Sequence, residues 1–364
     1  EADYYDKETS NLLLEVPLPS TSGYKTAFKN LGLVSNKGYE FAVNANMIEN
    51  RDFNWNMNFN ISFNENKVLD LGDADEFFVT AIGDNLTNND YIVKVGESLG
   101  SIYGLDFDGV YTYDDFVEFE GMTESEAASK LYADAAAVGD DGTAMWWSLN
   151  QYTLKDGVPL NALVTNGTYR PGMTKFKDIN GDGVINDDDR HIIGNTLPKH
   201  FGGMSQNLNF KNFDLSIQTS WSYGNDVYNK TLKKGIQTSV PWRNKFAIVN
   251  DRWSPENPMG KFTAFSAGSS GDVNSAAYDS YIEDGSYFRI GNITLGFTLP
   301  KDLIRKIGVK NLRIYASMDN VHIWTKYSGW DPDVSVGNNQ LTPGLDVDSY
   351  PRSRTFRTGI VARF

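Results

Sequence analysis

Apolar and polar residues alternate without a break from Phe53 to Asn64. The odd positions are apolar and the even positions are Asn or Ser, in the order FNWNMNFNISFN. Because successive side chains of a strand point to opposite faces, this pattern predicts a strand with one apolar face and one amide-lined face. Its apolar span would extend roughly 36 Å at about 3.3 Å per residue, and would rise roughly 25 Å when tilted by about 45°. That height matches the apolar band of a membrane β-barrel, and a long strand of a soluble β-sandwich is the alternative.

The neighbouring segments predict hairpins. Residues 39–47 carry Tyr, Phe, Val, Ala and Met at alternate positions, and the polar turn at residues 49–52 joins them to the first strand. A second hairpin spans residues 204–223, with its turn at residues 211–212. Aromatic residues at both ends of alternating strands are typical of the two interfacial girdles of a membrane barrel. In the second hairpin these residues are Phe210, Phe213, Trp221 and Tyr223.

Three more segments alternate in the same way, residues 292–299, 311–324 and 355–364, and we expect roughly ten strands in the whole chain. Short turns such as residues 211–212 alternate along the chain with long loops such as residues 224–285. Short turns at one end and long loops at the other are typical of outer-membrane barrels, in which the long loops face outward. We therefore predict an all-β fold, an antiparallel transmembrane β-barrel with long extracellular loops and short periplasmic turns.

Between residues 64 and 177 the sequence does not show which connections lie at the end with the short turns and which at the end with the long loops. Within this segment, residues 122–137 (MTESEAASKLYADAAA) predict a surface helix. Thr123 is its expected N-cap and Glu126 completes a capping box, because each side chain can bond the backbone NH of the other residue.

The composition narrows the class of protein. Cysteine is absent, which excludes a disulfide framework, a thiolate nucleophile and cysteine-bound zinc. The formal charge is −14 at pH 7, and an acidic surface argues against nucleic acid as a partner. No apolar run approaches the roughly 18 residues of a transmembrane helix. The start at Glu1, in EADYYDKETS, reads as the interior of a longer protein whose export signal lies upstream.

Residues 178–189, DINGDGVINDDD, are similar to a calcium-binding loop and are expected as an insertion between strands. Oxygen-bearing side chains alternate along the segment, and Gly183 stands where such a loop turns sharply. The last position is Asp rather than the usual Glu, so Mg²⁺ is an alternative to Ca²⁺. The competing interpretation is an acidic β-turn held by side-chain to backbone hydrogen bonds. The predicted ligands are Asp178, Asn180, Asp182, Val184 through its carbonyl, Asn186 and Asp189.

Further candidate sites are aromatic. Trp242, Trp253 and Trp330 lie in the long loops and could form platforms for sugar rings or peptide side chains, with packing of loops or barrel rim as the alternative for each. Phe364 ends an alternating strand and resembles the signal that outer-membrane assembly machinery reads, unless the last strand merely happens to end in Phe. The three histidines have no metal-binding spacing, and no local motif supports an enzyme.

Five segments carry a family resemblance. In order, they are NLGLVSNKGYEFAV, FKDINGDGVINDDDRHIIGNTLPKHFGGMSQNLNFKNFDLSI, EDGSYFRIGNITLGFTLP, LRIYASMDNVHIWTKYSGWDPD and YPRSRTFRTGIVARF. They resemble, in the family's own order, the SusC-like (SusC/RagA-type) TonB-dependent transporters of the bacterial outer membrane. The resemblance implies that residues 1–364 form the C-terminal part of a 22-stranded barrel, whose plug domain and TonB-contacting segment are not in this sequence.

The resemblance also implies an importer rather than an enzyme. Oligosaccharides or peptides would arrive beneath a SusD-like surface lipoprotein, and TonB would act on the plug so that they pass through the lumen. This chain would supply barrel wall, with Asn, Ser and Gln toward the lumen, apolar side chains toward outer-membrane lipid and long loops toward ligand. A soluble calcium-stabilised all-β binding module and a passive porin are the alternatives, and only the resemblance favours a transporter over a porin.

Overall fold

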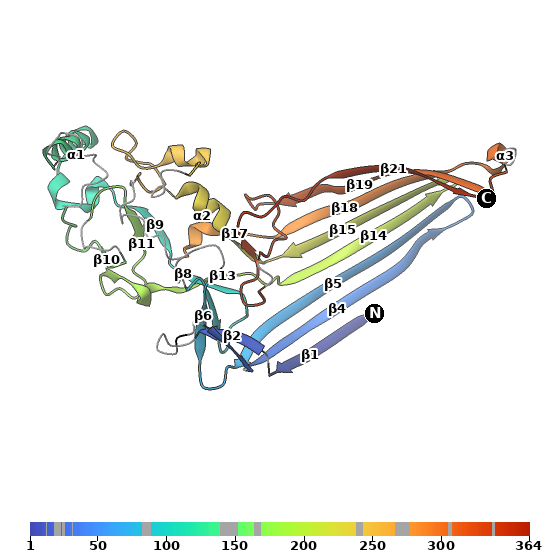
Figure 1. Ribbon diagram of the computed structural model, residues 1–364, viewed down its shortest axis with the longest axis horizontal. Coiled ribbons are helices and arrows are strands. Elements are labelled where there is room, and N and C mark those ends of the chain that lie inside the picture. The colour runs from blue at the N-terminus through green and yellow to red at the C-terminus, as the bar shows by residue number, and fades with distance from the viewer. Residues whose placement is uncertain are drawn as a thin grey trace.

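The described part of the chain forms a long antiparallel sheet at one end and a group of small sheets and helices at the other (Figure 1). No helix within it is long and apolar enough to cross a membrane. The computed structural model describes residues 1–11, 13–17, 23, 26–30, 32–81, 89–138, 152–163, 169–237, 243–265, 277–304, 308–336 and 339–364.

Eight strands form the long sheet, and every strand pairs antiparallel with the next one in sequence order. The all-β antiparallel architecture is therefore confirmed, with eight strands in this sheet where roughly ten were expected. The sequence pattern missed the first strand, β1. The eight strands are β1 (Ala2–Ser10), β4 (Leu33–Glu49), β5 (Phe53–Asp70), β14 (His200–Phe210), β15 (Phe213–Tyr223), β18 (Tyr287–Thr298), β19 (Asn311–Thr325) and β21 (Thr355–Arg363).

The connections are sorted by length between the two ends of this sheet, as predicted (Figure 1). Residues 50–52, 211–212 and 299–310 make the short connections, at the end where both termini lie. β5 pairs directly with β14, so residues 71–199 leave the sheet and return to it at the same end. This assigns the segment, whose position the sequence did not predict, to the end with the long connections. The long connections at the opposite end are residues 11–32, 71–199, 224–286 and 326–354.

Local chemistry at the short turns sets the strand register. Lys211 has a φ of 53°, the left-handed conformation that a two-residue hairpin turn requires. At the other hairpin, the Asn50 side chain accepts a hydrogen bond of 2.9 Å from the backbone NH of Phe53. The resulting register places Phe210 opposite Phe213. Because directly opposite residues share a face, it also decides which side chains line each face of the sheet.

The long connections fold together into what we call the loop domain. Its largest sheet has the order β13-β8-β7-β6, and the sheet β17-β16-β20 joins two different long connections. The strands of the loop domain are β2 (Leu13–Pro17), β3 (Thr26–Asn30), β6 (Glu76–Val79), β7 (Tyr91–Lys94), β8 (Ser101–Gly104), β9 (Phe107–Val110), β10 (Leu160–Asn161), β11 (Thr174–Phe176), β12 (Val184–Ile185), β13 (His191–Asn195), β16 (Asp226–Asn229), β17 (Ile282–Asp284) and β20 (Leu345–Asp346).

Helices are short and few in the described part of the chain. The α-helices are α1 (Glu124–Val138), α2 (Lys230–Ile236) and, between β18 and β19, α3 (Lys301–Ile304). The 3-10 helices are η2 (Tyr113–Asp115), η3 (Val117–Phe119), η5 (Asp187–Asp189), η6 (Ala247–Asp251) and η7 (Asp279–Tyr281).

The predicted helix and its cap are confirmed in α1. The Glu126 carboxylate accepts a hydrogen bond of 2.8 Å from the Thr123 backbone NH, and the Glu126 NH donates to the Thr123 hydroxyl at 3.3 Å. Ala127, Leu131 and Ala135 recur at helical spacing and are buried, while most of the rest of the helix is exposed. The helix thus lies on the surface of the loop domain with one face in its core.

The buried apolar core of the described residues lies mainly in the loop domain. It gathers side chains from separate long connections, among them Tyr91, Phe116, Trp253 and Leu345. A buried ion pair lies beside it, in which Nζ of Lys230 is 3.4 Å from Oδ2 of Asp90. Since these residues belong to different connections, apolar packing and this ion pair together make the long loops one folded unit.

Candidate functional site

The two faces of the long sheet differ in chemistry, and we name them the apolar face and the polar face. On the apolar face, Phe59 lies opposite Val43 on one neighbouring strand and Met204 on the other. No second sheet of the described chain packs on this face, so the β-sandwich interpretation is wrong. A continuous exposed apolar surface of this kind is a site of contact with lipid or protein. Its most exposed members include Tyr39, Phe41, Val43, Phe210, Phe213, Leu295, Ile314, Phe356 and Ile360.

Aromatic rings border the apolar face at both ends, as the second hairpin predicted. At the short-turn end, the Phe213 and Phe297 ring centroids are 4.7 Å apart. At the loop end, His200 lies between Phe63 and Tyr223, with ring centroids 5.3 and 4.9 Å away. Aromatic rings at two heights of an apolar band are typical of a barrel that sits in a bilayer.

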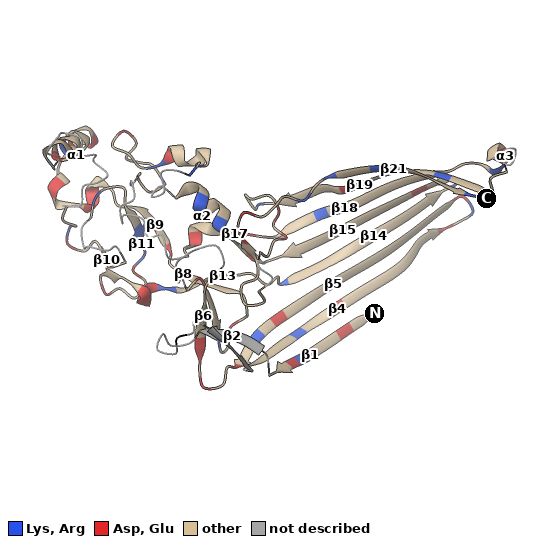
Figure 2. Ribbon diagram, in the orientation of Figure 1, with Lys and Arg blue, Asp and Glu red and all other residues tan. Residues whose placement is uncertain are grey.

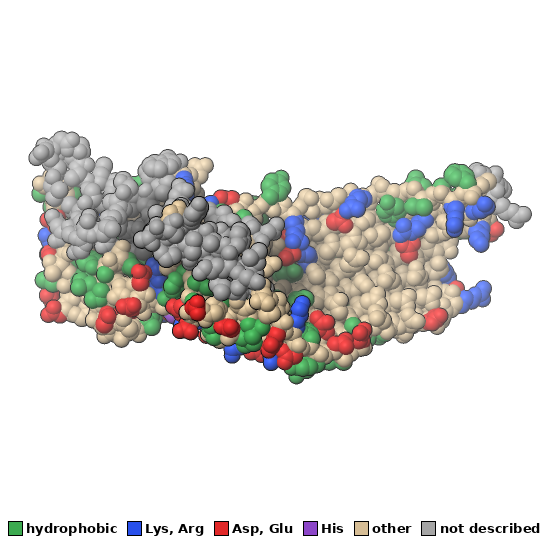
Figure 3. Space-filling view, turned by 60° about the horizontal axis from the view of Figure 1, so that its bottom comes forward, with side chains coloured by type: hydrophobic (Ala, Val, Ile, Leu, Met, Phe, Trp, Pro, Cys, Tyr) green, Lys and Arg blue, Asp and Glu red, His purple; other side chains and the backbone are tan. Residues whose placement is uncertain are grey.

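The polar face of β4, β5, β14 and β15 is lined mainly by amides and hydroxyls that bond across strands. Nδ2 of Asn58 donates to the Ser205 hydroxyl at 3.2 Å, and Oδ1 of Asn60 accepts from the Gly203 NH at 2.7 Å. A hollow of about 330 Å³ lies over this region, with Gln218 also in its lining. Uncharged polar side chains and backbone dominate the view of the sheet in Figure 3. Such a wall can exchange hydrogen bonds with a passing solute without attracting either sign of charge.

The polar face of the last strands carries charges in opposite pairs. Asp214 on β15 is bonded to Arg313 on β19, with Nε to Oδ1 at 2.9 Å, and Asp319 is bonded to Arg357. Nδ2 of Asn292 donates to Asp319 at 2.6 Å. Paired charges leave little net field along the wall, and Figure 2 shows that charged residues are sparse along the middle of the long strands.

A further ion-pair group fastens the last long connection to the sheet. The guanidinium of Arg289, on β18, bonds Asp331 at 2.5 Å and Asn320 at 3.1 Å. Asp331 also pairs with Arg352 at 3.2 Å, so both ends of the connection meet at the Asp331 carboxylate, which Arg289 holds against β18. Sequence reasoning missed Arg289, because its partners lie far along the chain and no periodicity marks it.

The predicted calcium loop closes on its own backbone. Oδ2 of Asp178 accepts from the Gly183 NH at 2.8 Å, and Oδ1 of Asp182 accepts from the Val184 NH at 2.8 Å. Asp189 is buried, and its Oδ1 and Oδ2 accept from Ile179 and Asn186 NH groups, both at 2.8 Å. No group of three acidic or histidine side chains in the described residues is arranged to hold a metal ion. The donor types suit Ca²⁺ or Mg²⁺, but the bonds seen are those of the acidic-turn interpretation, so the cation stays a prediction.

The three tryptophans have different surroundings. Trp330 is 73% exposed beside Asp331, so its ring is accessible, and its role as a platform stays a prediction. Trp253 is fully buried and packs against Tyr113, so its assignment to ligand binding is wrong. The close approach of Gly172, where a Cβ would lie 2.6 Å from the ring, explains how the core encloses such a large side chain. Trp242 lies outside the described residues.

Phe364 is exposed just beyond the end of β21, and its carbonyl accepts from Lys310 at 3.1 Å. This placement is compatible with an assembly signal, which stays a prediction. In the loop domain, Tyr132 on α1 donates to Glu256. Partial burial and this carboxylate raise the pKa of Tyr132 to about 12, and the same bond lowers the pKa of Glu256. The bond fixes α1 to residues 243–265.

Known proteins are similar to this chain in sequence over its whole length. No protein-family model matches it. TonB-dependent receptor P3 of Formosa agariphila is 33% identical over 374 residues, which cover 100% of this chain and 32% of that protein. TonB-dependent receptor SusC of Bacteroides thetaiotaomicron is 26% identical over 367 residues, which cover 100% of this chain and 30% of that protein. The chain thus spans about a third of the length of these relatives.

A solved structure, that of the RagAB peptide transporter, has the same fold. It matches with a TM-score of 0.67 at 18% sequence identity, over 99% of this chain and 32% of that chain. The matched relatives are receptors and transporters rather than enzymes. With the two-faced meander, the girdles and the sorted loops, these similarities identify the chain as the C-terminal portion of the β-barrel of a SusC-like TonB-dependent receptor.

Proposed function

We propose that the complete protein imports large polar nutrients across the outer membrane, using energy delivered through TonB. The observation that carries this proposal is the pairing of a lipid-type face with an amide-lined face on one meander of eight strands. The similarity to TonB-dependent receptors and to a peptide transporter supports import over passive flow. The long loops would then lie outside the cell and the short turns in the periplasm.

Each part of this chain has a role in the proposal. The amides of β4, β5 and β14 would form a wall of the lumen, where weak and exchangeable hydrogen bonds guide a solute without trapping it. Arg289 and its partners would hold the last loop at the mouth of the barrel. Residues of the loop domain, including exposed Trp330, would make first contact with the nutrient.

Two partners complete the proposal. A SusD-like surface lipoprotein would cover the loop end, as suggested by similarity to SusC and to RagAB. TonB would act through a plug domain elsewhere in the complete protein. Oligosaccharides and peptides are both proposed cargo, because amide side chains donate to and accept from sugar hydroxyls and peptide groups alike.

TonB dependence separates this importer from a passive porin. We expect that uptake of labelled oligosaccharides or peptides that requires this protein falls to background when TonB is deleted. The reason is that an energised plug must move before a large solute can pass. Uptake would be measured in cells that carry the intact protein, with a deletion of its own gene as the baseline. Uptake that persists without TonB would support the porin and contradict the proposal.

We also propose that the loop at residues 178–189 binds a structural divalent cation. Removing it should lower the melting temperature of the purified protein by about 2–6 °C, because a ligand bound only to the folded state stabilises that state. Melting would be followed with chelator, then after adding back Ca²⁺ or Mg²⁺. A variant with Asp178→Asn and Asp182→Asn should melt at the chelated value, while Asp156→Asn, outside the loop, should respond to chelator as the parent does. An unchanged melting temperature and no bound metal would refute the cation.

A further inference from the structure

One segment of the loop domain is strongly basic in an otherwise acidic chain. Residues 230–252 contain six Lys or Arg residues and one acidic residue, whereas the whole chain has a formal charge of −14. Two of the six, Lys230 and Lys233, are buried. The four others, Lys234, Arg243, Lys245 and Arg252, line two adjoining hollows of about 450 and 480 Å³ that share Phe246. We call these hollows the basic groove, and Figure 2 shows the positive charge along α2.

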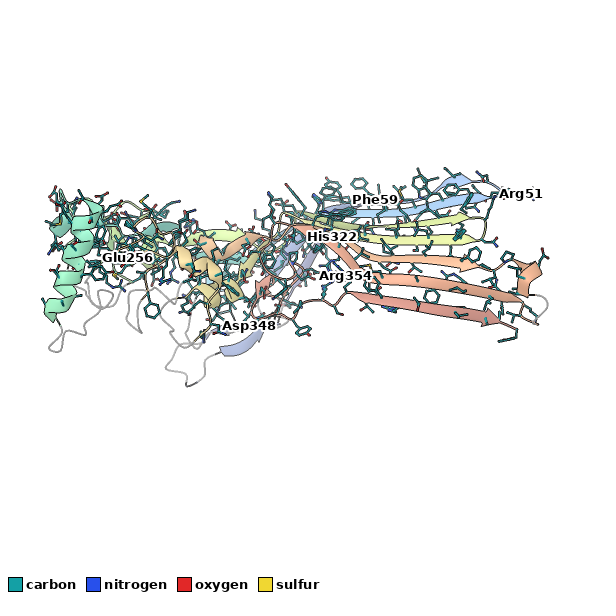
Figure 4. All side chains as sticks on the ribbon, turned by 90° about the horizontal axis from the view of Figure 1, so that it is seen from above. Arg51, Phe59, Glu256, His322, Asp348 and Arg354 are labelled. Atoms are coloured by element: carbon teal, nitrogen blue, oxygen red, sulfur yellow. The ribbon has the colours of Figure 1, made fainter. Side chains whose placement is uncertain are left out.

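Negative charge in the groove is scarce. Asp348 is the one carboxylate among its described lining residues, and it pairs with Lys234 at 2.7 Å (Figure 4). Arg243 is exposed and makes no ion pair or hydrogen bond with any described residue. Nη1 of Arg252 lies 3.5 Å from the Val249 carbonyl, and its charge contributes to the lowered pKa of Glu256, with which it forms no ion pair. An exposed guanidinium without a carboxylate partner, on an acidic protein, favours an anionic ligand.

Phe246 gives the groove a flat floor. A Cβ on Gly235 would lie only 2.3 Å from the ring, so the absence of a side chain there lets the ring pack directly on α2. The Phe246 NH also donates to the Gly235 carbonyl at 2.9 Å. The side chain is nevertheless 47% exposed. A ring supported from behind and open in front can stack against an apolar ring face.

We propose that the basic groove binds an acidic oligosaccharide, which deepens the proposed import function and rests on it. A carboxylate or sulfate group would bind Arg243 through paired charge-assisted hydrogen bonds. The apolar face of a sugar ring would stack on Phe246, and the exposed amides of Asn244 and Asn250 would bond its hydroxyls. An acidic peptide could pair its carboxylates with the cations of the groove, but its extended backbone offers the Phe246 ring no flat apolar face for stacking.

The test uses the complete purified transporter in detergent and four defined probes. They are a galacturonate hexamer, a sulfated galactose hexamer, a neutral glucose hexamer and a glutamate hexapeptide, each titrated by calorimetry. We expect at least one acidic sugar to bind, and Arg243→Gln to weaken it about fivefold or more. Arg243→Lys should weaken it less. Lys261→Gln is the matched control, since it removes an equal charge from an exposed side chain outside the groove.

The probes separate the possible outcomes. Preference for galacturonate or for sulfated galactose identifies the acid group. The inference is overturned if neither acidic sugar binds more tightly than the glucose hexamer, if the glutamate peptide binds as tightly, or if Arg243→Gln and Lys261→Gln have equal effects. Melting curves would show that each variant is folded. TonB-dependent uptake is measured separately. The proposal that the groove binds an acidic sugar can therefore be rejected while the proposal that the protein is an importer is retained.

Discussion

Replacing Phe59 by arginine in the complete protein should prevent the barrel from assembling in the outer membrane. Phe59 lies between the two aromatic girdles, in contact with Trp221 at a centroid distance of 5.5 Å (Figure 4). An arginine on the lipid side near the middle of the bilayer costs about 2–4 kcal/mol. That is a large share of the roughly 5–15 kcal/mol by which folded proteins are stable. The measurement is the amount of heat-modifiable barrel in purified outer membranes.

The neighbouring residue provides the matched control. Asn58 lies on the polar face, where it bonds Ser205. Asn58→Arg adds the same side chain one position away and should leave assembly near the parental level, because it points away from lipid. Phe59→Leu removes the stack with Trp221 but stays apolar, so it should assemble as well. Equal loss of barrel for both arginine variants would contradict the assignment of the two faces.

The long sheet could be predicted because its physics is local. Alternation decides which side chains share a face, and the turn at residues 211–212 decides the register, so Phe210 and Phe213 lie opposite each other as expected. β1 was missed because its charged and polar residues hide the alternation. β5 runs on to Asp70, beyond the predicted end at Asn64. The prediction stopped early because Glu65 and Lys67 interrupt the row of apolar residues once the strand passes the outer girdle.

The loop domain could not be predicted, because it depends on contacts between distant parts of the chain. Trp253 was placed in a polar loop by its neighbours, yet Gly172, far away in sequence, lets the core close over it. The basic groove needs α2 beside residues 243–252, and the charge alone did not reveal that Phe246 packs on Gly235. The Arg289 and Asp331 pair joins a strand to a loop 42 residues away.

The ion pair of Asp90 and Lys230 is the second place where a single change should have a large effect. Lys230→Met should destabilise the loop domain by about 3–5 kcal/mol, because it leaves a charged carboxylate in a buried site. Asp90 would keep its hydrogen bonds from the Ala81 NH, at 3.1 Å, and the Tyr228 hydroxyl, at 3.3 Å, but would lose the cation. Limited proteolysis of the purified protein would show the loosened loops as faster cleavage, with the membrane-embedded strands still protected.

Two further variants separate the charge from the packing. Lys94→Met removes a shorter ion pair, 2.8 Å to Glu76, that is exposed to solvent, and should cost at most about 1 kcal/mol. Adding Asp90→Asn to Lys230→Met should recover much of the loss, since asparagine removes the buried charge. Its Oδ1 can still accept from the Ala81 NH, and its Nδ2 can donate to the Tyr228 hydroxyl oxygen. If the double variant is cleaved as fast as Lys230→Met alone, then loss of the contact between the Lys230 ammonium and the Tyr228 ring, whose centroid is 5.6 Å from Nζ, outweighs the charge of Asp90. Recovery would instead show that the loop domain is stable only when the charge of Asp90 is neutralised. Because Lys230, which neutralises it, lies on α2, the same pair holds one side of the basic groove in place while a ligand binds.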